Sequence, residues 1–393
     1  MSRMNSLPLR VSLCLLCVFV VSSAPTRAAD LDPKRLAAID GAVARAIERG
    51  EVPGAVVVVV HDDAVVFRKA YGHRAVKPEK VPMTVDTVFD MASLTKPVAT
   101  ATSVMLLIEQ GKLKPSDLVA KHWPEFAANG KDAVTVEHLL LHTSGLTADN
   151  AIGDYTDGKA KAMENIARLK LEAPAGTRFR YSDVGFIVLG ELVERLGGMP
   201  VDQFANKHVF DPLKMADTGY KPGEELKKRV APTGLREMKL ILGEVHDPRA
   251  FRMGGVAGHA GLFSTADDTA RYCRMLLCGG ELDGTRVLSE KTVKLFTDPH
   301  TVSVVVKGKD DAKGARSYGW DVDTSFSAPR GDVFAKGTGH GHTGFTGTSV
   351  WVDPASKTAI VILSNRVHPD DKGNATPLRR EIATIVAKAV GKS

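Results

Sequence analysis

Ser93 and Lys96 lie three residues apart in FDMASLTKPVATATSVMLLIEQGK, residues 89–112, where an apolar run of helical character begins. Positions i and i+3 of a helix share a face, so both side chains point the same way. A serine at a helix N-terminus lies in the positive field of the macrodipole, which stabilises a forming alkoxide, and a nearby lysine amine can accept its proton. The spacing therefore permits a nucleophile and its base. Serine is also a favoured N-cap, so the same residues fit an ordinary helix start.

Three later segments place polar residues beside expected helices or strands. They are Tyr181-Ser182-Asp183 just before a helix, HTSGL at 142–146 after a short helix, and His342-Thr343-Gly344 at the beginning of a strand. Binding and catalytic residues concentrate on such segments because a rigid scaffold positions them. In combination with Ser93 and Lys96, these segments favour a catalytic interpretation over simple helix capping.

With these motifs the chain resembles the serine β-lactamase and penicillin-recognising enzymes, in particular the class C-like branch of D,D-peptidases, esterases and peptidoglycan amidases. The resemblance runs from about residue 33 to residue 390, and the order of SLTK, YSD and HTG carries it. The segments GGVAGHAGLFSTADD and GHTGFTGTSVWVDP look closest to exported hydrolases that act on cell-wall muropeptides. The resemblance implies that Ser93 is the acylated nucleophile, Lys96 its base, and Tyr181 a proton relay toward the leaving group.

The resemblance also implies an oxyanion hole and a substrate-binding strand. The backbone amides of Ser93 and Phe345 would be two fixed donors to the tetrahedral oxyanion, an interaction that supplies several kcal/mol in hydrolases. His342, Thr343 and Gly344 stand where the family usually carries Lys-Thr-Gly, and a glycine suits close approach of the backbone to substrate.

Two residues depart from the family pattern. Asp183 stands where the tyrosine motif commonly ends in asparagine, and a carboxylate near Lys96 favours the ammonium form, which weakens it as a base. Asp183 would alternatively bind a substrate amide or hold Lys96 in place. His342 replaces the usual lysine, so binding of a substrate carboxylate would depend on its protonation. These departures count against true β-lactamase activity, but not against acyl transfer.

Three other polar residues permit a metal interpretation. His246, Asp247 and His259 lie in the glycine-rich loops GEVHDPRA and GGVAGHAG. Their spacing matches no metal motif such as H-E-x-x-H, so we expect them to support the loops or line a cleft. We expect no metal and no organic cofactor. His142 in the HTSGL segment is expected to hold a loop.

The elements that must position these residues indicate an α/β (α+β) fold of the β-lactamase/D,D-peptidase type. Residues 32–50 predict a helix, 54–72 a hairpin turning at Asp62 and Asp63, 348–365 two strands joined at Asp353, and 375–390 a helix capped by Thr376. Between these β-rich ends the pattern is mostly helical. We therefore expect one antiparallel sheet flanked by helices, from about 31–92 and 315–393, with a helical subdomain over about 93–314.

The first 28 residues read as a signal peptide. Arg3 and Arg10 precede the apolar run VSLCLLCVFVVSSA, and a small-residue cleavage site follows at Ala28. A short membrane anchor is the alternative, and a lipid anchor on Cys14 or Cys17 is weaker because leucines precede both. Residues 29–393 would then form one exported hydrolase domain, periplasmic or secreted, without stable membrane insertion.

The composition excludes several classes of protein. Of 393 residues, 44% are hydrophobic and 25% charged, as in globular chains. The net charge of +6 falls to +3 without the three arginines of the leader, which is too mild for a nucleic-acid partner. Cys273 and Cys278, expected to be buried, lie on one predicted helix with poor geometry for a mutual disulfide. The patterns carry no signal for the oligomeric state.

The sequence thus predicts an exported serine hydrolase that forms an acyl-enzyme on Ser93. The expected substrate is a small molecule or muropeptide, hydrolysed at an amide or peptide bond of peptidoglycan origin. One alternative is a carboxylesterase or weak β-lactamase of the same fold. A second, non-enzymatic alternative is a penicillin-binding sensor domain that becomes acylated and stalls. Steady turnover, as opposed to a single burst per Ser93, separates the enzyme from the sensor.

Overall fold

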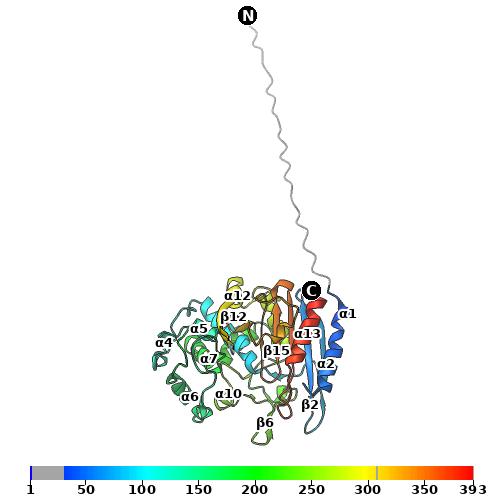
Figure 1. Cartoon of the computed structure of the whole chain (residues 1–393), viewed down its shortest axis with the longest axis horizontal. Coiled ribbons are helices and arrows are strands. Elements are labelled where there is room, and N and C mark those ends of the chain that lie inside the picture. The colour runs from blue at the N-terminus through cyan, green and yellow to red at the C-terminus, as the bar shows by residue number, and fades with distance from the viewer. Residues whose placement is uncertain (2–30, 307–308, 393) are drawn as a thin grey trace.

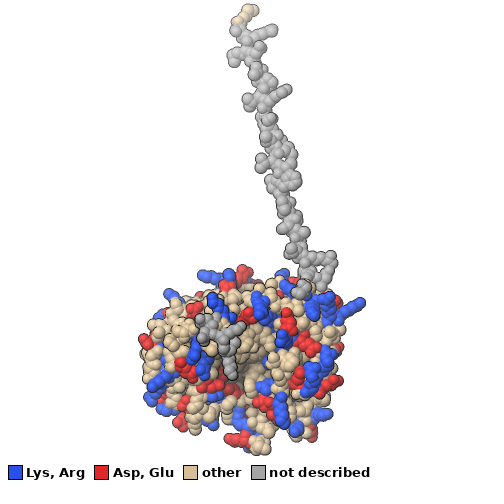
Figure 2. Space-filling model, viewed as in Figure 1, with Lys and Arg blue, Asp and Glu red and all other residues tan. Residues whose placement is uncertain are grey.

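The computed structural model describes residues 31–306 and 309–392 in addition to Met1. The predicted signal peptide, residues 1–28, lies outside the described residues apart from that first methionine. Within the described part, no helix combines the length and the apolar character needed to cross a bilayer. Basic and acidic side chains intermingle on the face shown in Figure 2, in keeping with the nearly balanced charge of the chain.

A nine-stranded antiparallel sheet forms the centre of the fold, in the order β11-β12-β13-β14-β15-β16-β1-β2-β3. In that order the strands are His300–Val306, Lys309–Ser317, Trp320–Asp323, His340–Thr343, Ser349–Asp353, Thr358–Leu363, Gly54–His61, Ala64–Ala75 and Val81–Pro82. The two ends of the chain meet at its middle, where Val56 of β1 is in register with Leu363 of β16. The predicted antiparallel sheet built from both ends is therefore confirmed.

Strand β1 separates two hydrophobic cores. Its sequence GAVVVVVH is buried along its whole length, as expected for a strand covered on both faces. Val56 and Val58 pack into the larger core with the helical region, while Val57 and Val59 pack into a smaller core on the other face. Helices α1 (Pro33–Leu36), α2 (Ala38–Glu48) and α13 (Thr376–Ala389) cover that smaller core (Figure 1). The sheet is thus the middle layer of three.

The remaining helices lie between β3 and β11 in the sequence and form most of the layer on the other face (Figure 1). They are α3 Thr102–Glu109, α4 Val119–His122, α5 Val136–Leu140, α6 Gly158–Ala167, α7 Asp183–Gly197, α8 Val201–Ala205, α9 Glu224–Lys227, α10 Pro248–Arg252, α11 Ala266–Leu277 and α12 Glu290–Thr297. A small sheet of β4 (Phe89–Asp90), β8 (Leu262–Ser264) and β5 (Gly219–Tyr220) leads directly into the segment that carries Ser93. The pairs β6/β7 (Leu235–Arg236, Lys239–Leu240) and β9/β10 (Glu281–Leu282, Thr285–Arg286) are short hairpins.

Three local expectations need correction. The sheet begins at His300 and not near 315, because β11 and β12 add two strands to its edge. Thr376 is the first residue of α13 and not its cap; its N–H donates to the Asn374 side chain at 3.0 Å. Cys278 is exposed, so only Cys273 has the expected burial. The first error concerns two whole strands, and the other two concern the ends of helices, where sequence patterns are least informative.

Candidate active site

Ser93 lies in a tight turn ahead of its helix. Residues Ala92–Leu94 form a 3-10 turn, and a π-helical turn over Lys96–Ala101 then runs into α3. Ala92 has φ of +46°, a conformation that favours glycine, and its N–H donates to Asp90 Oδ1 at 2.8 Å. Such strain costs about 1–3 kcal/mol and persists where the surroundings hold it, often at active sites. The turn presents the half-buried Ser93 side chain beside a cavity.

Lys96 is fully buried and surrounded by acceptors. Its Nζ lies 3.1 Å from Ser93 Oγ, 3.0 Å from the His259 carbonyl and 2.6 Å from Asp183 Oδ1. An ammonium has three N–H donors and no acceptor, so these three partners match the protonated form. Three acceptors around one nitrogen leave no lone pair directed at Ser93 in this state.

The electrostatics agree with that geometry. Burial alone would lower the pKa of Lys96, but the carboxylate of Asp183 and the neighbouring Tyr181 outweigh it and raise the pKa above its ordinary value. This is the direction that the sequence predicts from an aspartate at position 183. In the resting protein Lys96 is therefore an ammonium at neutral pH.

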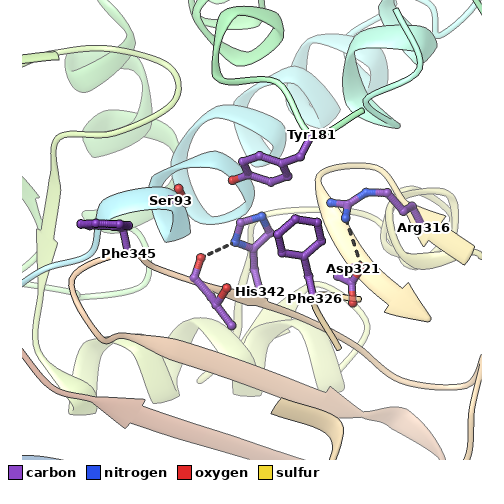
Figure 3. A pocket seen from close by; sticks show the side chains of 8 residues that line it. Ser93, Tyr181, Arg316, Asp321, Phe326, His342 and Phe345 are labelled. Atoms are coloured by element: carbon purple, nitrogen blue, oxygen red, sulfur yellow. Dashed lines mark hydrogen bonds and ion pairs between the residues drawn. The ribbon is translucent and has the colours of Figure 1, made fainter. Parts of the chain in front are cut away.

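Tyr181 lies over Lys96 and is held from behind by His142. The Lys96 nitrogen is 5.0 Å from the centre of the Tyr181 ring, and the tyrosine hydroxyl points toward Ser93 (Figure 3). His142 stacks on the tyrosine at 4.5 Å, and its Nδ1 accepts the Ser182 N–H at 3.0 Å. Burial raises the pKa of Tyr181, so its hydroxyl carries a proton. His142 thus has the loop-holding position expected for it.

The sheet side of the cavity is formed by β14 and the turn that follows it. His342 Nδ1 lies 2.9 Å from the Thr343 carbonyl, which accepts its proton and leaves Nε2 as the unprotonated ring nitrogen. Burial, with help from the charges of Arg316 and Lys96, lowers the pKa of His342 well below its usual range. The ring is therefore neutral near pH 7. A substrate carboxylate could be bound by His342 as a cation only if the ring were protonated, so His342 does not fill that role at this pH.

Phe345 follows on the turn after β14. In Figure 3 Ser93 lies between Phe345 on one side and Tyr181 on the other. Among the described residues, the backbone N–H groups of Ser93 and Phe345 donate to no other protein group. Both remain available to an oxygen atom of a substrate. The structure therefore brings every sequence-predicted site residue to one place, with Thr343 on the cavity wall and Gly344 directly after it.

The cavity has a volume of about 180 Å³ and a cation at its inner end. Arg316 of β12 is fully buried, and its Nη1 donates to Asp321 Oδ1 at 3.1 Å. Its Nε and Nη2 have no hydrogen-bond partner among the described residues. Phe326 also lines the cavity, and in the view of Figure 3 it lies between His342 and Asp321. No motif surrounds Arg316, Asp321 and Phe326, so the sequence carries no signal for them. They come to the cavity because β12 and β13 extend the sheet beyond β14.

One group of side chains has the composition of a metal site. Ligand atoms of Asp183, Asp247 and His259 lie within 4.8 Å of one another. His259 Nε2 is 2.9 Å from Asp247 Oδ1, and Lys96 is 2.6 Å from Asp183. These contacts lower the pKa of Asp247 despite its burial, so its carboxylate is ionised. Since the ammonium of Lys96 and the ring of His259 already partner both carboxylates, the group fits the expected supporting role better than a metal site.

The fold and this arrangement define a hydrolase of the β-lactamase fold. The sequence model of the Beta-lactamase family matches residues 39–384, and the chain belongs to that family. It is 32% identical to a putative D-alanyl-D-alanine carboxypeptidase of Escherichia coli O157:H7, over 89% of this chain and 86% of that protein. It is 33% identical to an N-acetylmuramyl-L-alanine amidase of Bacillus subtilis, over 86% and 83%.

Solved structures agree on the fold. The hydrolase EstCE1, described as having promiscuous acyltransferase activity, superimposes with a TM-score of 0.73 at 24% identity, over 90% of this chain and 99% of that one. A penicillin-binding protein homologue from Caulobacter crescentus gives the same TM-score at 22% identity, over 91% and 98%. At these identities the likeness concerns the fold alone. The predicted fold and the assignment to hydrolases are confirmed.

Proposed function

We propose that this hydrolase acts through an acyl-enzyme on Ser93 and cleaves amide or peptide bonds in peptidoglycan-derived substrates. The observation that carries the proposal is the position of Ser93 Oγ, 3.1 Å from a buried lysine and on the wall of a cavity. Relatives named as a carboxypeptidase and as a muramyl-alanine amidase support the substrate class. Such enzymes meet their substrate outside the cytoplasm, which fits the predicted signal peptide and a periplasmic or secreted location.

In the proposed reaction Ser93 Oγ bonds to the carbonyl carbon while its proton passes to Lys96. Lys96 accepts that proton only after it has released one of its own, so Asp183 sets the fraction of enzyme that is active at a given pH. Tyr181 relays the proton to the leaving nitrogen as its bond to carbon breaks. The N–H groups of Ser93 and Phe345 stabilise the oxyanion. Water then hydrolyses the ester of Ser93 and releases the acid.

The cavity suggests how a substrate would be oriented. Arg316 lines the cavity and supplies a positive charge there. Its Nε and Nη2, the two-nitrogen edge that matches a carboxylate, are covered, so a carboxylate would be attracted by the charge and would reach that edge only after the side chain moves. We assign recognition of a substrate carboxylate to Arg316, because His342 is neutral. Thr343 also lines the cavity and offers a hydroxyl.

The experiment is digestion of purified muropeptides with product identification by mass spectrometry. The wild type should release a free carboxylic acid and an amine fragment at a steady rate, and Ser93→Ala should release neither. Equal release by both proteins would refute the nucleophile assignment. A single burst equal to the amount of enzyme would instead favour the acylated sensor.

A carboxylesterase is the second candidate, because the cavity mouth is aromatic. Phe326 and Phe345 line it and are 41% and 54% exposed, large values for phenylalanine. Apolar ester groups would bury this surface, whereas charged muropeptides would not. Comparing kcat/KM for a short-chain aryl ester with that for a muropeptide decides between the two substrate classes.

A further inference from the structure

Arg379 binds the peptide unit that carries one of the two oxyanion donors. It belongs to α13 and reaches the turn after β14 from the face of the sheet opposite to Ser93. Its Nη2 donates to the Gly344 carbonyl at 3.0 Å and to the Thr348 carbonyl at 2.9 Å. The Gly344 carbonyl and the Phe345 N–H belong to the same planar peptide group. A contact with the carbonyl therefore fixes the direction of the N–H.

The charge of Arg379 is unusual because it is buried without a counter-ion. The side chain is 93% buried, and no carboxylate among the residues in the described ranges lies within ion-pair distance. Its Nε has no hydrogen-bond partner there either. Burial lowers the pKa of Arg379, yet a guanidinium stays protonated near neutral pH. An unpaired buried cation costs several kcal/mol, so its retention needs a reason beyond packing.

Two other arginines beside the cavity or its turn, the buried Arg316 and the partly buried Arg366, are neutralised. Arg316, equally inaccessible, pairs with Asp321 at 3.1 Å. Arg366 also contacts the turn, donating from Nε to the Phe345 carbonyl at 2.7 Å, but it pairs with Asp371 at 2.5 Å. Arg379 differs from both because only peptide carbonyls receive its hydrogen bonds. The positive field of Arg379 therefore acts along the 344–345 peptide group, whose N–H faces the cavity.

The same turn is attached to the segment that precedes Ser93. Thr346 Oγ1 donates to the Asp90 carbonyl at 2.7 Å, and Thr348 Oγ1 donates to the Met91 carbonyl at 3.0 Å. A Cβ at Gly344 would overlap Thr348 Oγ1 and the Met91 carbonyl, so no side chain fits there. The two N–H donors thus stand on segments joined by hydroxyl groups and supported from behind by one cation.

We propose that Arg379 is a positioning residue of the oxyanion hole. It fixes the plane of the 344–345 peptide and polarises it, so that the Phe345 N–H becomes a stronger donor when negative charge develops on the substrate oxygen. This inference rests on the proposed acyl-enzyme function. It concerns the transition state, so substrate binding in the ground state should not depend on Arg379.

The test compares Arg379→Gln, Arg379→Lys and Arg380→Gln with the wild type. Arg380 is the matched control, because it follows on the same helix but is exposed and pairs with Asp332. We expect Arg379→Gln to lower kcat by roughly 10- to 100-fold with KM within about threefold, a size typical of weakening one oxyanion donor. Arg379→Lys, which keeps the charge, should lose less, and Arg380→Gln should match the wild type.

A boronic acid that forms a tetrahedral adduct with Ser93 supplies the second readout. Its affinity should weaken in Arg379→Gln by the same factor as kcat, whereas a purely structural role would lower melting temperature without that correlation. If Arg379→Gln does not fold, Arg379→Lys gives the same comparison. Wild-type kcat in Arg379→Gln, a loss in Arg379→Lys as large as in Arg379→Gln, or a change confined to KM overturns the inference. Absence of Ser93-dependent turnover in the wild type would instead refute the proposed function.

Discussion

Buried charged groups have different partners on the two sides of Ser93. On the side of Lys96, each carboxylate has a nitrogen partner at short range: Asp183 is 2.6 Å from the ammonium, and Asp247 is 2.9 Å from His259 Nε2. On the side of the Phe345 amide, Arg379 is buried against carbonyl oxygens alone. The first side can be called the proton side and the second the oxyanion side.

The difference fits the roles proposed for the two sides. A group that exchanges protons needs partners that set its pKa, and Lys96 obtains them from Asp183 and Tyr181. A group that stabilises developing charge must keep its own charge and orientation throughout the reaction, since preorganised dipoles need no rearrangement. Neutralising Arg379 with a carboxylate would cancel the field that this task requires.

The largest expected effect is on the nucleophile, where both sides meet. Ser93→Ala should lower kcat by at least about 10³-fold, because no covalent intermediate can form. Stopped-flow measurement with a chromogenic ester should show no burst of product. The adjacent Leu94→Ala, which removes only buried apolar surface, controls for damage to the turn. A burst of product in Ser93→Ala would mean that another residue is acylated, and the roles assigned to both sides of Ser93 would be wrong.

The proton side is tested next by Lys96→Ala and Lys96→Arg. Loss of the proton acceptor should lower kcat by roughly 10²–10⁴-fold with KM little changed. Arginine keeps a cation for Asp183 but does not release its proton near neutral pH, so it should be almost as inactive as alanine. Steady-state kinetics on both variants decides this. Substantial turnover in Lys96→Arg would show that the lysine contributes charge and not proton transfer.

Asp183→Asn should change the pH profile more than the maximal rate. Without the carboxylate, burial dominates and the pKa of Lys96 falls, so the acid limb of kcat/KM moves to lower pH, by about 1–3 units. Near neutral pH the active fraction then rises by roughly 10- to 1000-fold, including for any residual β-lactam hydrolysis. Glu191→Gln, on the same helix and paired with Arg195, is the control. An unchanged profile would mean that Asp183 does not govern Lys96.

These two sides also differ in how far the sequence predicts them. The proton side is encoded in short motifs, SLTK and YSD, which fix spacing and residue type locally. His342 and Gly344 belong to a motif too, but the sequence places them at the beginning of a strand, whereas His342 and Thr343 end β14 and Gly344 begins the turn after it. Arg379 follows Leu378 and precedes the exposed Arg380, and nothing local distinguishes the two arginines. Only the packing of α13 against the sheet assigns one of them to the turn.

The missed part of the fold has a related cause. Strand β12 reads KDDAKGARS, without the alternation of apolar and polar residues that predicts a strand. It forms because β11 and β13 pair with it on both sides. Arg316, the buried cation of the cavity, lies on that strand, so missing the strand also meant missing a candidate substrate-binding residue.

His342 offers a smaller test of the oxyanion side. Because its pKa lies well below 6.5, the ring stays neutral and kcat/KM should show no limb assigned to it between pH 5 and 8. The profiles of wild type and His342→Asn should have the same shape over that range, with rates measured on a substrate bearing a carboxylate. A limb near pH 6.5 that disappears in His342→Asn would show that His342 is protonated in this range. His342 would then bind the substrate carboxylate when it is a cation.

The smallest effect concerns stability and not activity. His340 shares β14 with His342, and burial lowers its pKa to about 3. Between that value and the ordinary value of about 6.5, the unfolded chain binds one more proton than the folded chain, so stability is lost as the pH falls. Replacing His340 by glutamine should reduce the slope of unfolding free energy against pH by up to about 1.4 kcal/mol per unit in this range. Urea unfolding at pH 7, 6, 5 and 4 measures the slope, and turnover at pH 7 should stay within about twofold of wild type. An unchanged slope would show that His340 binds protons equally well in the folded and the unfolded chain, which would contradict the lowered pKa of His340.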